Sequence, residues 1–267
     1  MSAIRLGTRA STLATTQSEM VARLLRSEGL DVDLTTITTH GDTSTASLAA
    51  MGGIGVFASA IRATLLKGEA DIAVHSFKDL PTGRPLGLAI GAVPARADPR
   101  DALVARDGLT LHDLPQEASV GTGSPRRAAQ LLAVRPDLTI VDIRGNVDTR
   151  LGRVKGLGHY AKGGGKEDLD AVVLAASGLA RLGHSGTVTE FLDPSVVLPA
   201  PAQGALAVEC RTADSRHGKL AKALARIDDR RTRLAATAER AVLSHLEAGC
   251  AAPIGALAQL KPVSGSS

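Results

Sequence analysis

Residues 121–127, GTGSPRR, combine residue types that bind anions. The two glycines permit a close approach of the backbone, Ser124 suits a helix N-cap, and Pro125 suits the first helical position. A helix that begins there presents free N–H groups beside the guanidinium groups of Arg126 and Arg127. No Gly-Lys-Ser/Thr sequence follows, so this is not the phosphate loop of a nucleotide-binding protein. Because guanidinium groups bind carboxylates as well as phosphates, the sequence predicts a polycarboxylate or a phosphate ester as ligand.

Further charged residues come directly after apolar runs that read as strands. Lys78 and Asp79 follow the run in DIAVHSF, residues 71–77. The other residues at strand ends are Arg9, Arg144, Asn146 and, one helical turn later, Arg150. In open α/β sheets ligands bind beyond the carboxyl ends of the strands, so these side chains are candidates for one site. The alternative is structural: surface arginines are often only solvated, and Lys78–Asp79 could be a surface ion pair of little energetic worth.

The two cysteines have different surroundings. Cys210 lies in the apolar segment GALAVEC and reads as a small buried hydrophobe. Cys250 lies in the loop LEAGCAAPIGA, where a thiol is accessible as a nucleophile or an attachment point, although local chemistry alone slightly favours a structural role. Two cysteines do not make a disulfide framework, which predicts a reducing, cytoplasmic location. The seven histidines lack metal-ligand spacing, so no metal site is expected.

The composition argues against two classes of partner. The net charge of +4 is modest, and with no Trp, one Tyr and three Phe the chain lacks the stacking faces of a single-strand binder. No apolar run approaches the length of a membrane span, and the first residues do not resemble a signal peptide. We therefore expect no nucleic acid and no membrane as partner.

Short apolar runs alternate with helical patterns, which is typical of an α/β protein with parallel strand pairing. Strands are predicted at 3–9, 32–42, 71–77, 101–107, 119–124, 138–145, 169–176 and 254–260. Helices are predicted after Ser11, up to about Lys67, at 125–136 and 146–154, and through 220–227 and 234–242. Read linearly, the pattern gives two α/β units, with Pro-rich crossings near residues 100 and 200.

Taken together, these stretches resemble the porphobilinogen deaminase (hydroxymethylbilane synthase) family. The motifs occur in order over nearly the whole chain: IRLGTRASTLATTQ, TTHGD, DIAVHSFKDLP, DPRDAL, GTGSPRRAAQL, IRGNVDTRL, LAASGLARLG, PAPAQGALAVECR and AERAVLSHLEAGCAAPIGA. Each motif is weak or moderate alone, but their joint order is highly specific.

The resemblance implies three domains. Two α/β domains like those of periplasmic binding proteins would flank the active cleft, and a smaller α+β domain would carry the cofactor. The implied boundaries are 1–95 plus 196–214, then 100–192, then 216–267, so the chain would return to the first domain after residue 195, which the linear reading misses. Only 17 residues follow Cys250, where relatives usually continue for several strands and a helix, so we expect a truncated or minimal third domain.

The resemblance also implies a chemistry. Such enzymes join four porphobilinogen molecules head to tail, release ammonia at each step and give hydroxymethylbilane, primed by a dipyrromethane that is bound through a thioether. The matching cysteine is Cys250, which replaces the structural reading, and the matching catalytic aspartate is Asp79, which would stabilise a cationic azafulvene. Matching positions near the cofactor are Lys78, Ser124, Arg126, Arg127 and Arg144. Matching positions for the substrate carboxylates and the active site are Arg9, Arg150, Arg96, Gln17 and Phe57.

Three departures from the family pattern are present: Ile54 where lysine is common, Thr12 where proline is common, and Ala248 where glycine is common. Relatives are commonly monomers, so a monomer is expected. Two other classes remain: a two-domain module that binds an anionic small molecule without chemistry, and a nucleic-acid binder that uses the basic cluster 126–153.

Overall fold

The computed structural model describes residues 3–37, 56–83, 85–247 and 252–260, with no account of the side chains of Val56 and Phe57. Ile54, Ala248 and Cys250 lie outside the described residues. Within the described ranges, no helix is long and apolar enough to cross a membrane.

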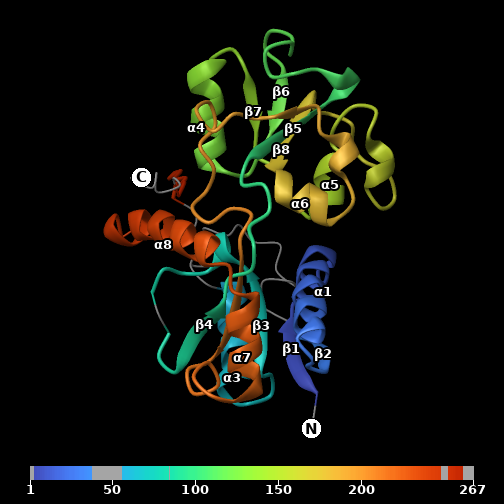
Figure 1. Ribbon diagram of the computed structural model, residues 1–267. Coiled ribbons are helices and arrows are strands. Elements are labelled where there is room, and N and C mark those ends of the chain that lie inside the picture. The colour runs from blue at the N-terminus through green and yellow to red at the C-terminus, as the bar shows by residue number, and fades with distance from the viewer. Residues whose placement is uncertain (1–2, 38–55, 84, 248–251, 261–267) are drawn as a thin grey trace, which may run out of the picture.

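Two five-stranded sheets form two lobes, which lie one above the other in Figure 1. The first lobe holds, in sheet order, β2 (Val32–Thr36), β1 (Ile4–Thr8), β3 (Ile72–Ser76), β10 (Leu206–Arg211) and β4 (Leu88–Ala92). The second lobe holds β7 (Thr139–Val141), β6 (Ser119–Gly121), β8 (Ala171–Ala175), β5 (Asp101–Ala105) and β9 (Glu190–Phe191). In each sheet the first three strands are parallel and the fourth is antiparallel to both neighbours.

The described helices are α1 (Thr12–Ser27), α3 (Val56–Leu66), α4 (Pro125–Val134), α5 (Val147–Leu151), α6 (Ala176–Arg181), α7 (Gly218–Ile227) and α8 (Arg230–His245). The described 3-10 turns are η1 (Phe77–Asp79), η2 (Arg106–Gly108), η3 (Gly158–Tyr160) and η4 (Ser185–Thr187). Side-chain caps explain several helix starts: Ser11, Ser124, Asn146 and Asp229 each accept a backbone N–H from the first turn. The helix starts predicted after Ser11 and at Pro125 are therefore confirmed.

The crossings between the lobes explain the chain path. The chain enters the second lobe through residues 93–100 and returns through 193–205 to β10, which inserts between β3 and β4. The linear prediction of two successive units did not include this return, because strand pairing between residues 130 positions apart leaves no local pattern.

Two further predictions differ from the structure. Strands β4 and β9 were not predicted, and the strand predicted at 254–260 is wrong. In that segment the N–H of Ala256 donates to the carbonyl of Pro199 at 3.0 Å, and the N–H of Ala258 donates to Glu239 Oε1 at 2.9 Å. Arg231 Nη2 also donates to the carbonyl of Leu260 at 3.4 Å, so the segment is held by a crossing loop and by two side chains of α8 and pairs with no strand of the described residues.

Each lobe has its own apolar core. The first-lobe core packs Leu6 and Ile72 of the sheet against Val21 of α1, and it includes Ala223 and Leu224 of α7. Thus α7, although it lies within the predicted third-domain range 216–267, packs on the first lobe. In the second lobe, separate clusters of buried side chains cover the two faces of the sheet.

Helix α8 is fastened to the crossings by a buried ion pair. Glu239 is 1% exposed and receives Arg96 in a bidentate pair, with Nη1–Oε1 at 2.6 Å and Nη2–Oε2 at 2.9 Å. The same carboxylate accepts the N–H groups of Ala202 and Ala258 at 2.6 Å and 2.9 Å. Arg96 Nε also donates to the carbonyl of Gln203 at 2.7 Å, so the pair joins both crossings to α8.

Replacing Glu239 by Gln should destabilise the fold strongly. The variant leaves the Arg96 charge buried without a counter-charge, and breaking a buried pair in this way costs about 3–5 kcal/mol. The matched control is Glu19→Gln, because Glu19 pairs with Arg26 at 2.8 Å on the surface and should cost under about 1 kcal/mol. Urea unfolding of the wild-type protein and the two variants measures both free energies of unfolding. Equal small losses in the two variants would contradict the role of the Glu239–Arg96 pair in fastening α8.

Candidate active site

One buried ring, that of Phe77, anchors the polar turn after β3. Strand β3 is buried up to His75, and the chain then tightens into η1. Phe77 is 6% exposed and packs against Ala205 and Ala236. With this ring in the core, Lys78 is half-buried and Asp79 is exposed at the end of the turn. Because Phe77 anchors the turn, Lys78 and Asp79 at this strand end are presented to a surface.

A hydrogen-bonded line leads from this turn into the second lobe. Lys78 Nζ donates to Gln203 Oε1 at 3.2 Å, and Gln203 Nε2 donates to Asp101 Oδ1 and to the carbonyl of Pro99, both at 2.8 Å. Burial lowers the pKa of Lys78 to about 8, with Arg127 acting in the same direction and Asp79 and Asp101 opposing it. The lysine therefore titrates near neutral pH.

The line ends at Asp101, the buried first residue of β5, which carries two guanidinium partners. Arg126 Nη2 donates to its Oδ2 at 2.8 Å, while Arg127 Nε and Nη2 donate to Oδ1 at 3.0 Å and 2.6 Å. Burial alone would raise the pKa of Asp101, but the charges of Arg127 and Arg126 outweigh it and hold the pKa at about 2. Asp101 is thus a carboxylate that balances part of the guanidinium charge.

The start of α4 orients these two arginines. Ser124 caps the helix by accepting the N–H of Arg127, and its own N–H donates to Thr122 Oγ1 at 3.2 Å. A side chain at Gly123 would meet the carbonyl of Ile143 at 2.7 Å, so only glycine allows this loop to approach the end of β7 so closely. The predicted role of the glycine at 123 has a physical cause here.

Two more guanidinium groups stand beside Arg127. Burial, and then the charges of Arg127 and Arg144, lower the pKa of Arg150, whose Nε donates to the carbonyl of Gly145 at 2.8 Å. Arg144 is exposed, and its Nη2 lies 3.2 Å from Asp142 Oδ2. The positive charges that lower the pKa of Arg150 also favour a bound carboxylate.

The remaining predicted site residues lie in different settings. Arg96 is paired with the carboxylate of Glu239. Gln17 is buried in α1 and exchanges hydrogen bonds with Ser76 Oγ at 3.0 and 3.2 Å, directly before η1. Arg9 is half-buried just past β1, which neighbours β3. Phe57 is the second residue of α3, and its side chain is outside the description, as is Cys250.

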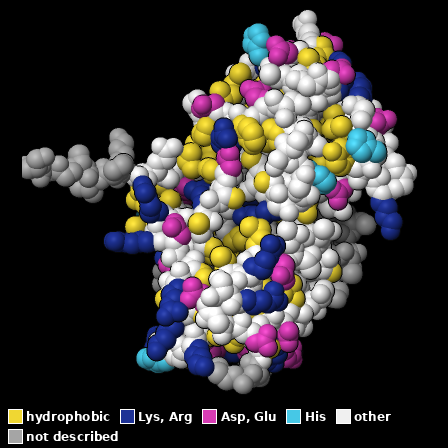
Figure 2. All heavy atoms as spheres, turned by 45° about the vertical axis from the view of Figure 1, so that its right-hand side comes forward, with side chains coloured by type: hydrophobic (Ala, Val, Ile, Leu, Met, Phe, Trp, Pro, Cys, Tyr) yellow, Lys and Arg dark blue, Asp and Glu magenta, His cyan; other side chains and the backbone are white. Residues whose placement is uncertain are grey.

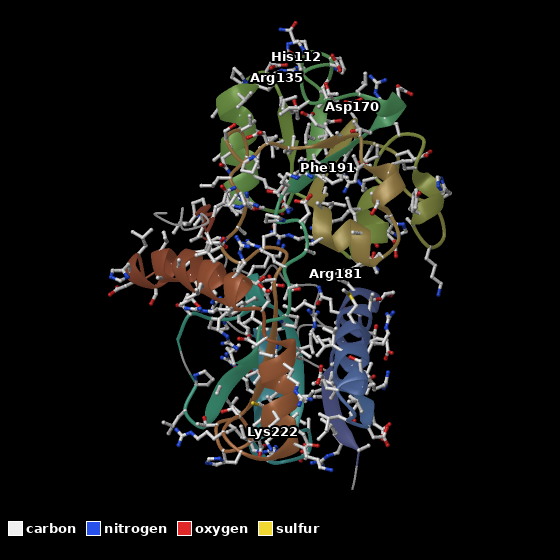
Figure 3. The ribbon with its side chains drawn as sticks, viewed as in Figure 1. His112, Arg135, Asp170, Arg181, Phe191 and Lys222 are labelled. Atoms are coloured by element: carbon white, nitrogen blue, oxygen red, sulfur yellow. The ribbon has the colours of Figure 1, made fainter. Side chains whose placement is uncertain are left out.

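Sequence reasoning missed three polar residues of this region: Asp101, Gln203 and Arg181. The only signal for the first two was their place in the Pro-rich crossings. Arg181 ends α6 and donates from Nη2 to the carbonyl of Gly204 at 2.7 Å. In Figure 3 its label lies between α6 and α1. Burial lowers the pKa of Arg181 to about 10, and its buried Nε has no hydrogen-bond partner among the described residues.

The arrangement sets several guanidinium groups in the same region as an exposed carboxylate. On the face seen in Figure 2, Lys and Arg side chains lie where the two lobes meet. No group of His, Cys, Asp and Glu that could hold a metal ion is found in the described part of the chain. Such a surface can bind a ligand with several carboxylates and stabilise positive charge next to Asp79.

Comparison with known proteins gives consistent matches over the chain. The family model of the porphobilinogen deaminase dipyrromethane cofactor binding domain matches residues 4–219, and that of the porphobilinogen deaminase C-terminal domain matches 233–264. Porphobilinogen deaminase of Cutibacterium acnes is 97% identical over 267 residues, which are all of this chain and 80% of that protein. The enzyme of Micrococcus luteus is 57% identical and covers 97% of this chain and 74% of its own length.

Among solved structures, a periplasmic substrate-binding protein of an ABC transporter from Coxiella burnetii aligns with 89% of this chain and 95% of its own. The identity is 15% and the TM-score is 0.49. The family assignment rests on the sequence matches, and by these the chain belongs to the porphobilinogen deaminase family.

Proposed function

We propose that this chain condenses four porphobilinogen molecules into hydroxymethylbilane. In this proposal Asp79 is the catalytic carboxylate, and the guanidinium cluster of Arg126, Arg127, Arg144 and Arg150 is the binding surface. The observation that carries the proposal is the hydrogen-bonded line from Lys78 through Gln203 to Asp101 and its two arginines. This line joins Lys78, the neighbour of the exposed Asp79 in the turn, to the carboxylate and guanidinium groups of the opposite lobe, and every pyrrole ring of the substrate bears two carboxylates.

The residues present fit the dipyrromethane cofactor that this family uses. The pyrrole carboxylates need several donors, and Arg126, Arg127, Arg144 and Arg150 supply planar guanidinium groups. The partnerless Nε of Arg181 and the mutual repulsion around Arg150 leave donor capacity and positive charge for a ligand. When attached to Cys250, the dipyrromethane supplies the terminal pyrrole carbon to which the first substrate is joined.

Asp79 acts where charge develops on the substrate. As the C–N bond of the protonated aminomethyl group of porphobilinogen breaks, its electron pair leaves with nitrogen as ammonia, and positive charge remains on the pyrrole methylene. A fixed carboxylate beside that centre stabilises the charge in the transition state more than in the ground state. Lys78, when protonated, adds a donor for the carboxylates held near the turn.

We also propose the setting in which the enzyme works. The scarcity of aromatic side chains argues against nucleic acid, and Cys210, a buried free thiol, is consistent with a reducing cytoplasm. We propose a monomer, because relatives in this family are commonly monomers. For the domains, we propose 1–95 with 196–214, 100–192, and a third domain that starts at α8, because α7 packs in the first-lobe core.

Replacing Asp79 by Asn should abolish most turnover and leave the fold intact. The amide keeps the shape but not the charge, and loss of one such electrostatic group lowers kcat by about 100- to 1000-fold. Ammonia release from porphobilinogen measures it, with Asp107→Asn, an exposed aspartate of η2, as control. Near-wild-type turnover in Asp79→Asn would contradict the role, and tight binding of unreacted porphobilinogen by the unaltered protein would favour the binding-module alternative.

Activity should fall as pH rises through about 8, because Lys78 loses its proton there. Below that pH the ammonium group binds carboxylates, and above it the neutral amine does not, so kcat/KM should decline on the alkaline side. In Lys78→Arg the charge persists across this range, and the decline should vanish. Lys67→Arg, at the exposed end of α3, is the control. A decline unchanged in Lys78→Arg would mean that another group titrates.

The intact mass of protein from a haem-making host should exceed the mass of the chain by one dipyrromethane. The excess should disappear in Cys250→Ser, which lacks the thiol for the thioether. Cys210→Ala is the matched control, because burial raises the pKa of Cys210 to about 11 and keeps it an unreactive thiol. An unmodified wild-type mass, or an excess that survives in Cys250→Ser, would refute the attachment.

A further inference from the structure

One side chain of α8 holds the turn that carries Lys78 and Asp79. Arg240 Nη1 donates to the carbonyls of Phe77 at 2.9 Å and Leu80 at 2.8 Å, and its Nη2 donates to the carbonyl of Pro81 at 2.7 Å. Its guanidinium carbon also lies 4.5 Å from the centroid of the Phe77 ring. One guanidinium group therefore contacts the turn on both sides of the two functional residues.

The carbonyls of Leu80 and Pro81 need an outside donor, whereas that of Phe77 already accepts the N–H of Leu80 at 3.3 Å. A three-residue 3-10 turn satisfies few of its own backbone groups, and the carbonyls at its end are left without intrahelical partners. Pro81 then prevents the chain from continuing as a helix. A cation at this end satisfies the carbonyls and complements their partial negative charge. Without Arg240 the ring of Phe77 would remain as the anchor, but the exit of the turn would lose its three hydrogen bonds.

Arg240 differs from Arg233, the arginine seven residues earlier on α8. Arg233 pairs with Asp228 at 2.8 Å, whereas Arg240 forms no ion pair within the described residues. Burial, with repulsion from Arg62, lowers the pKa of Arg240 to about 10, so it stays charged at neutral pH. Its charge is directed wholly at backbone carbonyls and one aromatic face.

We propose that Arg240 is a positioning residue that fixes Asp79 and Lys78 relative to α8. Glu239, the residue before it, fastens α8 to the crossings, and α8 precedes Cys250 in the sequence. The two neighbouring side chains thus tie one helix to the lobe crossings and to the catalytic turn. The inference rests on the proposed function of Asp79.

The test compares Arg240→Ala, Arg240→Lys and the control Arg233→Ala as cofactor-loaded enzymes. Intact mass and thermal unfolding first establish that each variant is folded and loaded. In Arg240→Ala, kcat should fall at least about tenfold with little change in KM, since small displacements of a catalytic group are costly. Arg240→Lys keeps one charged donor and should recover part of kcat. Arg233→Ala should retain wild-type kcat, because its contacts are Asp228, between α7 and α8, and the carbonyl of Gly91 in β4.

Chemical rescue separates positioning from general structure. A cavity of about 640 Å³ lies between α8 and the residues 77–90 and is lined by Arg240, Phe77 and Leu80. Methylguanidinium can enter the space left in Arg240→Ala and donate to the same carbonyls. Saturable recovery of kcat in that variant, absent in Arg233→Ala, is expected. If Arg240→Ala does not fold, Arg240→Lys carries the test, through its kcat and KM alone.

The double variant Asp79→Asn/Arg240→Ala distinguishes this proposal from the proposed function. If Arg240 acts through the turn, its removal should slow Asp79→Asn by a smaller factor than it slows the wild-type enzyme, the remainder coming from Lys78. An active Asp79→Asn would overturn the role of Asp79. A folded, loaded Arg240→Ala with wild-type kcat, or effects of the two substitutions that multiply, would overturn the positioning role and leave Asp79 in place.

Discussion

The buried carboxylate of Asp101 is the constraint on which the site depends. A carboxylate in a dry interior is strongly unfavourable unless it is paired and hydrogen-bonded, and Asp101 is satisfied by Arg126, Arg127 and Gln203 together. Those donors arrive from the start of α4 and from the returning crossing. The position of the binding surface, the path of the crossing and the location of Lys78 therefore follow from the need to compensate one charge.

The same pairing leaves the cluster with more positive than negative charge. One buried carboxylate balances two guanidinium groups, and Arg150 and Lys78 stand close enough for those groups to lower their pKa. Repulsion of this kind weakens the folded protein, and a ligand with several carboxylates relieves it. Binding energy is thereby stored in the fold, which suits an enzyme whose substrates and growing chain carry two carboxylates on each ring.

Local patterns in the sequence predicted the parts of the site that are built locally. The N-cap at Ser124 and the polar end of β3 depend on neighbours within a few residues, so GTGSPRR and HSFKD were informative. The partners of these groups were not predictable from the residues themselves. Asp101 meets Arg127 across 26 positions and Lys78 meets Gln203 across 125, and no periodicity encodes such distances. The expected strand at 254–260 failed for the same reason, because its partner is Glu239.

The bonding of α8 also bears on how the cleft can adapt to a lengthening product. Two side chains of α8, Glu239 and Arg240, join the turn of the first lobe to the crossings. Their partners are Arg96, Ala202, Phe77 and Pro81. These bonds are short, charged and buried, so the first lobe and α8 form one body around Asp79. Gln203 is part of that body, because its carbonyl accepts Arg96 Nε at 2.7 Å and its Oε1 accepts Lys78 Nζ at 3.2 Å, so the link to the second lobe runs through its 2.8 Å side-chain bond to Asp101. Displacement of the second lobe strains this contact first and leaves the geometry between the catalytic turn and α8 unchanged.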